Sequence, residues 1–208
     1  MFTILFQLQS ANAMATAITN GITDLINHST TMTAATQLET LASITIENRT
    51  KPKMEEVRVE MAEMKVESKP IELVTSVGSC VAICLYDATR MCGGLAHIML
   101  PRSSISQEPL PSKFADTAVP ALAQAIRKYS GKESRLSAKI AGGSNMFPNM
   151  NALNIGEKNI AAVKAALAEH KIRLLAEDVG GSHGRRINFD IATGIATVKR
   201  FNGAVIKL

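Results

Sequence analysis

The sequence of 208 residues has no tryptophan and few other aromatic side chains. Aromatic residues make up 4% of the chain, whereas 46% of its residues are hydrophobic. An apolar core therefore has to be built from aliphatic side chains, alanine and the ten methionines, which fill irregular gaps well. No hydrophobic run approaches the roughly 20 residues of a membrane-spanning helix, so we expect no direct membrane insertion.

Cysteine is also scarce, and the three residues present are Cys80, Cys84 and Cys92. The first two lie in one stretch that is typical of a strand, on the same face but about 13 Å apart, too far for a disulfide. The sequence has no pair of C-x-x-C motifs and therefore offers no zinc ribbon. These features favour a reducing, cytoplasmic location and a site without a metal.

Positive charge is in slight excess but is not concentrated. The formal net charge is +5, and the densest basic cluster is the pair Arg185-Arg186. Binding to nucleic acid requires a denser patch or stripe of basic side chains. We therefore expect no nucleic-acid partner, whereas an acidic protein surface is compatible with this charge.

Charge is almost missing from residues 1–53, which contain eleven threonines, three basic and three acidic residues. Threonine is a poor residue for helix interiors, so the segment is predicted to be a poorly ordered, Thr-rich extension. Its short apolar run at residues 4–6 lacks the preceding basic residues of a secretory signal. The compositional change predicts one domain over residues 54–208, with Met54 as an alternative start.

From Glu55 onward the hydrophobic pattern predicts strands interrupted by two helices. The first helix is expected over residues 116–128, and the second begins after Asn154, a helix-capping residue with Glu157 three positions later. Strands are expected at 57–66 with a break near 62, at 71–76, 81–85, 94–100, 136–140, 172–176, 187–191 and 195–199. Strands, two helices and further strands indicate an α+β domain.

The segment with the clearest chemistry is Gly78-Ser79-Cys80, at the entrance of the apolar run 81–85. A polar turn around Ala88-Thr89 separates this run from the next one, which contains His97. A hairpin centred on that turn places Cys80 close to opposite His97, about 4.5–5.5 Å apart between Cβ atoms. A histidine base can activate a thiol as a nucleophile. From these residues alone, Cys80 is either the nucleophile of a catalytic pair with His97 or an inert thiol, and both interpretations remain open.

The remaining cysteines and histidines have weaker patterns. Cys84 lies within the apolar run and is expected to be a buried, inert thiol, and Cys92 is expected in a turn without a nearby base. His183 lies in a glycine-rich loop and is the rival base. His170 suits the last turn of the second helix, where positive charge is favourable, and His28 is an isolated polar residue.

Two glycine pairs, Gly142-Gly143 and Gly180-Gly181, interrupt the second half of the domain. Neither pair lies in a G-x-x-x-x-G-K-[ST] or G-x-G-x-x-G frame, so nucleotide binding is unsupported. The pairs are expected to form tight turns that pack around the hairpin.

Several blocks of this sequence resemble the CheD family of chemoreceptor glutamine deamidases. The blocks are Thr75–Asp87 (TSVGSCVAICLYD), Gly93–Pro101 (GGLAHIMLP), Lys139–Phe147 (KIAGGSNMF), Ile155–Asn159 (IGEKN), Asp178–Gly181 (DVGG) and Gly184–Arg186 (GRR). Together they span about residues 57–199, and their common order makes the resemblance specific. Residues 1–53 have no counterpart in the family.

The resemblance implies a β-sandwich flanked by helices and a cysteine hydrolase that converts receptor glutamines to glutamate. The family's cysteine and histidine match Cys80 and His97, and its threonine matches Thr75 or the neighbouring Ser76. Backbone N–H groups around Ser79 and Gly78 are the candidates for stabilising the oxyanion. No cofactor is required.

The resemblance also implies partners. These are the cytoplasmic domains of methyl-accepting chemoreceptors and the phosphatase CheC, through which the family responds to phosphorylated CheY. One alternative is a non-catalytic adaptor that binds receptors or CheC without turnover. Another is a cysteine hydrolase that acts on a different protein amide or ester.

Overall fold

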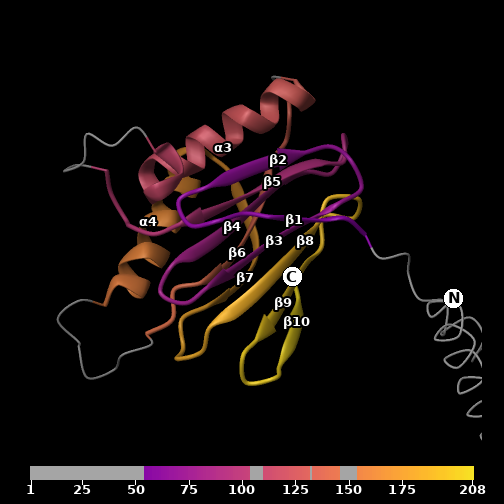
Figure 1. Ribbon diagram of the computed structural model, residues 1–208. Coiled ribbons are helices and arrows are strands. Elements are labelled where there is room, and N and C mark those ends of the chain that lie inside the picture. Colours follow the sequence, from indigo (N-terminus) through magenta and orange to yellow (C-terminus); the bar gives the residue numbers. More distant parts are fainter. Residues whose placement is uncertain (1–53, 104–109, 132, 146–153) are drawn as a thin grey trace, which may run out of the picture. The chain divides into compact units, whose positions relative to one another are not determined.

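The computed structural model describes residues 54–103, 110–131, 133–145 and 154–208 (Figure 1). The predicted extension, residues 1–53, lies outside the described residues. The described ones form ten strands in two mixed sheets and two α-helices, α3 and α4. The predicted α+β class and the sandwich with flanking helices are both confirmed.

The first sheet has the spatial order β1-β3-β8-β9-β10. Only β1 and β3 are parallel in it, and the other neighbours are antiparallel. Its strands are β1 (Glu56–Arg58), β3 (Glu72–Val77), β8 (Arg185–Asp190), β9 (Ala196–Arg200) and β10 (Val205–Lys207). The hairpin of β8 and β9 was predicted, whereas the three-residue β10 is too short to leave a pattern.

The second sheet has the order β2-β5-β4-β6-β7, in which only β6 and β7 are parallel. Its strands are β2 (Met64–Glu67), β4 (Val81–Asp87), β5 (Cys92–Ile98), β6 (Ser137–Gly142) and β7 (Arg173–Val179). Every residue of β4 is buried, as the uninterrupted apolar run predicts for a strand covered on both faces.

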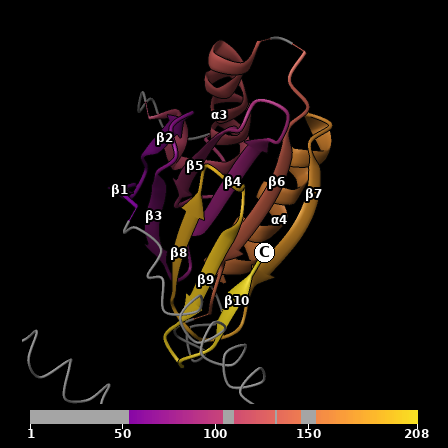
Figure 2. The same cartoon turned by 90° about the vertical axis from the view of Figure 1, so that its right-hand side faces the viewer.

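The two sheets and the helices form three layers (Figure 2), with an apolar core in each of the two spaces between them. One core lies between the two sheets and contains the large side chains of Leu73, Leu95 and Phe189. The other lies between the second sheet and the helices. The helices α3 (Ala115–Ser130) and α4 (Ile155–Glu169) cover the outer face of the second sheet, and a short 3-10 helix, η1 (Pro111–Lys113), precedes α3.

Local signals account for several element boundaries. The predicted break near Ala62 is confirmed, because Ala62 adopts a φ of 59° and separates β1 from β2, which join different sheets. The Asn154 side chain accepts a hydrogen bond from the Glu157 N–H at 3.3 Å and caps α4 as predicted. None of the helices in the described ranges is long and apolar enough to cross a bilayer.

The register of the hairpin β4–β5 differs by two residues from the prediction. Ala82, not Cys80, lies directly opposite His97. The difference arises in the turn, where the Asp87 carboxylate accepts hydrogen bonds from the N–H groups of residues 89 and 90. The turn therefore contains four residues, and Cys92 is the first residue of β5 instead of a turn residue.

Candidate active site

The loop Gly78–Cys80 connects the two sheets, because it links β3 of the first to β4 of the second. All three of its carbonyl oxygens accept hydrogen bonds: Gly78 from the Ser144 N–H at 2.8 Å, Ser79 from the Asn159 side chain at 3.1 Å, and Cys80 from the Gly143 N–H at 2.7 Å. Within the described parts of the chain, the N–H groups of Ser79 and Cys80 donate to no other residue. The described contacts thus hold the loop by its carbonyl groups.

The glycine pair Gly142-Gly143 gives this loop its close backbone neighbour. The two residues have φ values of 118° and 66°, which side-chain-bearing residues rarely adopt. A Cβ atom on Gly142 would collide with the Cys80 carbonyl oxygen. The Gly142 carbonyl in turn accepts from the Gly180 N–H at 2.9 Å. Gly142-Gly143 thus packs beside the hairpin as predicted, whereas Gly180-Gly181 contacts Gly142 and Asn145 instead of the hairpin.

Cys80 and His97 lie on the same face of the second sheet. His97 is opposite Ala82, and Cys80 precedes Ala82 by two residues, which in a strand returns to the same face. Cys80 and Ala82 both pack in the core between the sheets, so this face is the inner one. A diagonal pair of this kind is separated by about 7–8 Å, less between Cβ atoms, within reach of a histidine ring.

Thr75 reaches His97 from the opposite sheet. It lies on β3 between two residues of the inter-sheet core, Leu73 and Val77, and is itself buried. Its Oγ1 is 2.8 Å from His97 Nδ1 and 2.8 Å from the carbonyl oxygen of Val59. The carbonyl can only accept, so the single hydroxyl proton is directed to Val59 and the Thr75 oxygen accepts from Nδ1–H.

This arrangement assigns the tautomer of His97. With the proton on Nδ1, the neutral ring has its lone pair on Nε2. Nε2 is buried and has no hydrogen-bond partner among the described residues. An unpartnered, buried proton acceptor on the face that carries Cys80 is what a base for the thiol requires.

Burial shifts both groups toward their neutral forms. It lowers the pKa of His97, an effect that the charge of Glu60 partly opposes. Burial also raises the pKa of the Cys80 thiol, which its own backbone N–H opposes. At neutral pH the resting pair is therefore a thiol and an imidazole, not an ion pair.

Ser76, the alternative to Thr75, lies on the other face of β3. It is exposed and directly opposite Arg186 in the sheet. The structure thus brings Thr75 and not Ser76 to the imidazole.

The other cysteines and histidines lie elsewhere. Cys84 is fully buried, which raises its pKa to about 12 despite the nearby charge of Lys139. Cys92 is buried and its pKa is also raised, mainly by burial. His183 and His170 are exposed, and His170 caps the C-terminus of α4. The isolated His28 lies outside the described residues.

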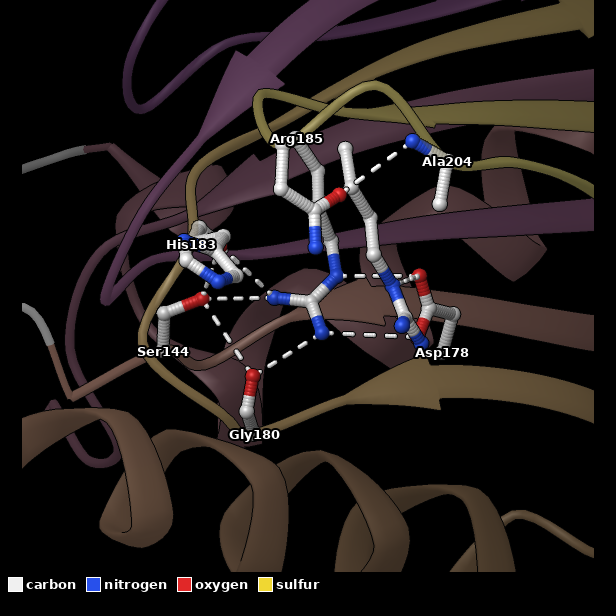
Figure 3. Close-up of polar contacts among 8 residues, drawn as sticks. Ser144, Asp178, Gly180, His183, Arg185 and Ala204 are labelled. Carbon is white, nitrogen blue, oxygen red and sulfur yellow. Dashed lines mark hydrogen bonds and ion pairs between the residues drawn. The ribbon is translucent and has the colours of Figure 1, made fainter.

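A buried ionic cluster next to the loop was not anticipated as a group. The Arg185 guanidinium lies between the Asp178 carboxylate and the Ser144 hydroxyl (Figure 3). Arg185 Nε is 3.0 Å from Asp178 Oδ2, and its Nη1 is 2.5 Å from Ser144 Oγ. Arg200 forms a second ion pair with Asp178. Because the Ser144 N–H donates to the Gly78 carbonyl, the cluster anchors the start of the loop Gly78–Cys80.

Asn159 and Ser144 both contact the loop Gly78–Cys80, and the sequence did not predict either contact. Both were part of blocks that resemble the CheD family, yet nothing in their spacing indicates contact with the loop near residue 80. Each is fully buried.

The chain is similar to proteins of one known family. A family model described as CheD chemotactic sensory transduction matches residues 99–200. A protein of Desulforamulus reducens named "Probable chemoreceptor glutamine deamidase CheD" is 44% identical over 149 residues, covering 69% of this chain and 90% of the relative. Relatives with the same name are 43% identical in Methanococcus vannielii (70% of this chain, 96% of the relative) and 42% in Clostridium botulinum (70% and 93%).

Proposed function

The chain belongs to the CheD family, and on this premise we propose that it deamidates glutamine side chains of chemoreceptors with Cys80 as the nucleophile. The relatives' name supplies the substrate class. The observation that carries the proposal is the hydrogen bond between Thr75 and His97, which leaves Nε2 unpartnered on the face shared with Cys80. Cys80 is only partly buried, whereas Cys84 and Cys92 are buried.

In the first half of the reaction, His97 Nε2 accepts the thiol proton as the Cys80 sulfur attacks the carboxamide carbon of glutamine. The substrate oxygen gains negative charge and accepts hydrogen bonds from the N–H groups of Ser79 and Cys80, which donate to no other described residue. One such donor contributes about 3–4 kcal/mol in other enzymes. His97 then donates its proton to the nitrogen of this tetrahedral intermediate, the C–N bond breaks, and ammonia leaves while the substrate stays bound to Cys80 as a thioester.

In the second half, a water molecule attacks the thioester carbon. Neutral His97 accepts the proton of that water and returns it to the departing sulfur, which regenerates the Cys80 thiol and releases glutamate. Thr75 keeps the ring in the required tautomer and orientation through both halves. No step requires a metal or an organic cofactor.

The proposed partners follow from the same family. They are the cytoplasmic domains of methyl-accepting chemoreceptors and the phosphatase CheC, and the proposed location is the cytoplasm. Neither nucleic acid nor insertion into a membrane has a part in the reaction.

The function is tested with a purified cytoplasmic fragment of a chemoreceptor. Incubation with the protein should release ammonia and raise the mass of specific glutamine-containing peptides by the replacement of NH2 with OH. Stable co-purification with the receptor or CheC and no mass change would favour the adaptor instead. Turnover of other amides or esters, with the receptor unchanged, would point to a different cysteine hydrolase.

Removing the Thr75 hydroxyl should slow the reaction with little effect on substrate affinity. In Thr75→Val the Nδ1–H loses its acceptor, so the imidazole is no longer fixed in orientation or tautomer. We expect kcat to fall about 100-fold, less than the roughly 10000-fold loss when a protease triad loses its charged orienting residue. Initial rates of ammonia release measure the change.

Two variants serve as controls for Thr75→Val. Thr75→Ser keeps the hydroxyl and should retain most of the activity. Ser76→Ala alters the neighbouring, outward-facing residue and should leave kcat unchanged. If Ser76→Ala were the slower enzyme, Thr75 would lose its proposed role.

A further inference from the structure

Asn159 joins the ends of the two strands that carry the nucleophile and the base. It projects from α4 and is fully buried. Its Nδ2 donates to the carbonyl oxygen of Ser79 at 3.1 Å and to that of Met99 at 2.9 Å. Ser79 immediately precedes Cys80, and Met99 follows His97 by two residues.

The orientation of this amide is fixed by its partners. Both neighbouring atoms are carbonyl oxygens, which only accept, so the NH2 group and not Oδ1 has to face them. Oδ1 is buried and has no hydrogen-bond partner within the described residues. The side chain therefore uses both of its protons on the two strand ends.

The two hydrogen bonds of Asn159 lie just beyond the end of the β4–β5 pairing. The ladder of β4 and β5 ends with the pair Val81 and Ile98, and Cys80 lies one residue beyond it. Among the described residues, no backbone hydrogen bond joins the two chain segments beyond this pair. There the Asn159 side chain, on α4, links the two segments by donating to a carbonyl oxygen of each.

We propose that Asn159 is a positioning residue that sets the separation between Cys80 and His97. The proposal rests on the proposed function, in which His97 removes the thiol proton. Asn159 touches neither the sulfur nor the imidazole in the hydrogen-bond network, and it acts through the backbone on either side of them. A displacement of about 1 Å at a reacting group can reduce a rate by about 100-fold.

The direct measurement is alkylation of Cys80 by iodoacetamide as a function of pH. The full-length protein is used, and the peptide that contains Cys80 is quantified by mass spectrometry. In Asn159→Ala, alkylation near neutral pH should slow about 10-fold, and its pH profile should move toward that of His97→Ala, because the thiol loses its base. In turnover, kcat should fall about 100-fold while KM changes little.

A double-mutant comparison separates positioning from general damage. Adding Asn159→Ala to His97→Ala should slow alkylation no further, because the base on which Asn159 acts is already gone. Ser130→Ala is the matched control: it removes another buried hydrogen bond, between Ser130 Oγ and the Ile126 carbonyl on α3, and should leave alkylation unchanged. Asn159→Asp preserves side-chain volume while removing both donors, so it should reproduce the effect of Asn159→Ala.

Three results would overturn the proposal. They are equal slowing by Asn159→Ala with and without His97, a rise in KM at constant kcat, and unfolding of both Asn159 variants, which would assign the residue to the core alone. Alkylation needs no receptor. If the wild-type protein released no ammonia, the proposed function would fail while the measurement of positioning remained interpretable.

Discussion

Replacing Cys80 by alanine is expected to abolish ammonia release from receptor fragments. Without the sulfur no thioester forms, and neither His97 nor the N–H groups of the loop can replace a nucleophile. Loss of the nucleophile in a triad enzyme reduces kcat by about 10⁶-fold, so activity should fall below detection. The measurement is ammonia release together with peptide mass, over a time in which the wild type reaches completion.

Cys84→Ala is the matched control for this variant. Cys84 lies on β4, the strand that begins directly after Cys80, and both side chains pack in the inter-sheet core, so each change removes one sulfur from that core. Its thiol is fully buried and has a pKa of about 12, so it is almost entirely protonated at neutral pH. Cys84→Ala should therefore remain active. Activity in Cys80→Ala, or its loss only in Cys84→Ala, would assign the nucleophile elsewhere.

Asp178→Asn is expected to cause the largest loss of stability among near-isosteric changes. Asp178 is the shared anion of Arg185 and Arg200, and the side chains of Asp178 and Arg185 are each 4% exposed. Asparagine keeps the volume but leaves the buried guanidinium of Arg185 without a counter-charge. Breaking a buried pair in this way costs about 3–5 kcal/mol. Denaturant unfolding at neutral pH measures the difference.

The Glu56→Gln variant is the control for that experiment. Glu56 pairs with Arg186 at 2.8 Å, a shorter contact than the 3.0 Å between Asp178 and Arg185. The side chains of Glu56 and Arg186 are, however, 41% and 42% exposed. An exposed pair contributes about 0–1 kcal/mol, so its removal should hardly change the unfolding midpoint. Equal effects of the two variants would show that burial does not distinguish the pairs.

The cost of Asp178→Asn should also depend on pH. Burial raises the pKa of Asp178, but hydrogen bonds and charges from Arg200 and Arg185 lower it by more, so the net pKa in the folded protein is depressed. The stabilisation is therefore fully present above the unfolded-state value of about 3.9 and is lost as the pH falls through the folded-state value. The difference between wild type and variant should shrink in acid.

The local pattern predicted most elements but not the register that aligns them. The break near Ala62, the cap at Asn154 and the buried strand β4 all depend on neighbouring residues and were predicted correctly. The register of β4 on β5 depends on how the turn forms. The Asp87 carboxylate accepts hydrogen bonds from two N–H groups in that turn. With the turn formed in this way, Ala82 and not the predicted Cys80 lies opposite His97.

The choice between Thr75 and Ser76 was a question about faces. Alternation places Thr75 on the same face as Leu73 and Val77 and places Ser76 on the opposite face. Once the inner face of β3 is known, this alternation identifies Thr75 as the residue that points toward His97. Asn159 lies beyond that reasoning. Its contact with Ser79 joins residues 80 positions apart, and only the packing of α4 on the sheet creates it.

His97 belongs to the second sheet and Cys80 immediately precedes its strand β4, whereas Thr75, the residue proposed to orient His97, belongs to the first sheet. The hairpin of β4 and β5 closes over a few residues, but β3 takes its place beside β8, whose Ile187 lies opposite Thr75 from more than a hundred positions away. Contacts of such long range form late when a chain folds, because loop closure is costly. Catalytic competence should consequently return as one of the last events in refolding, after much of the backbone structure has already formed.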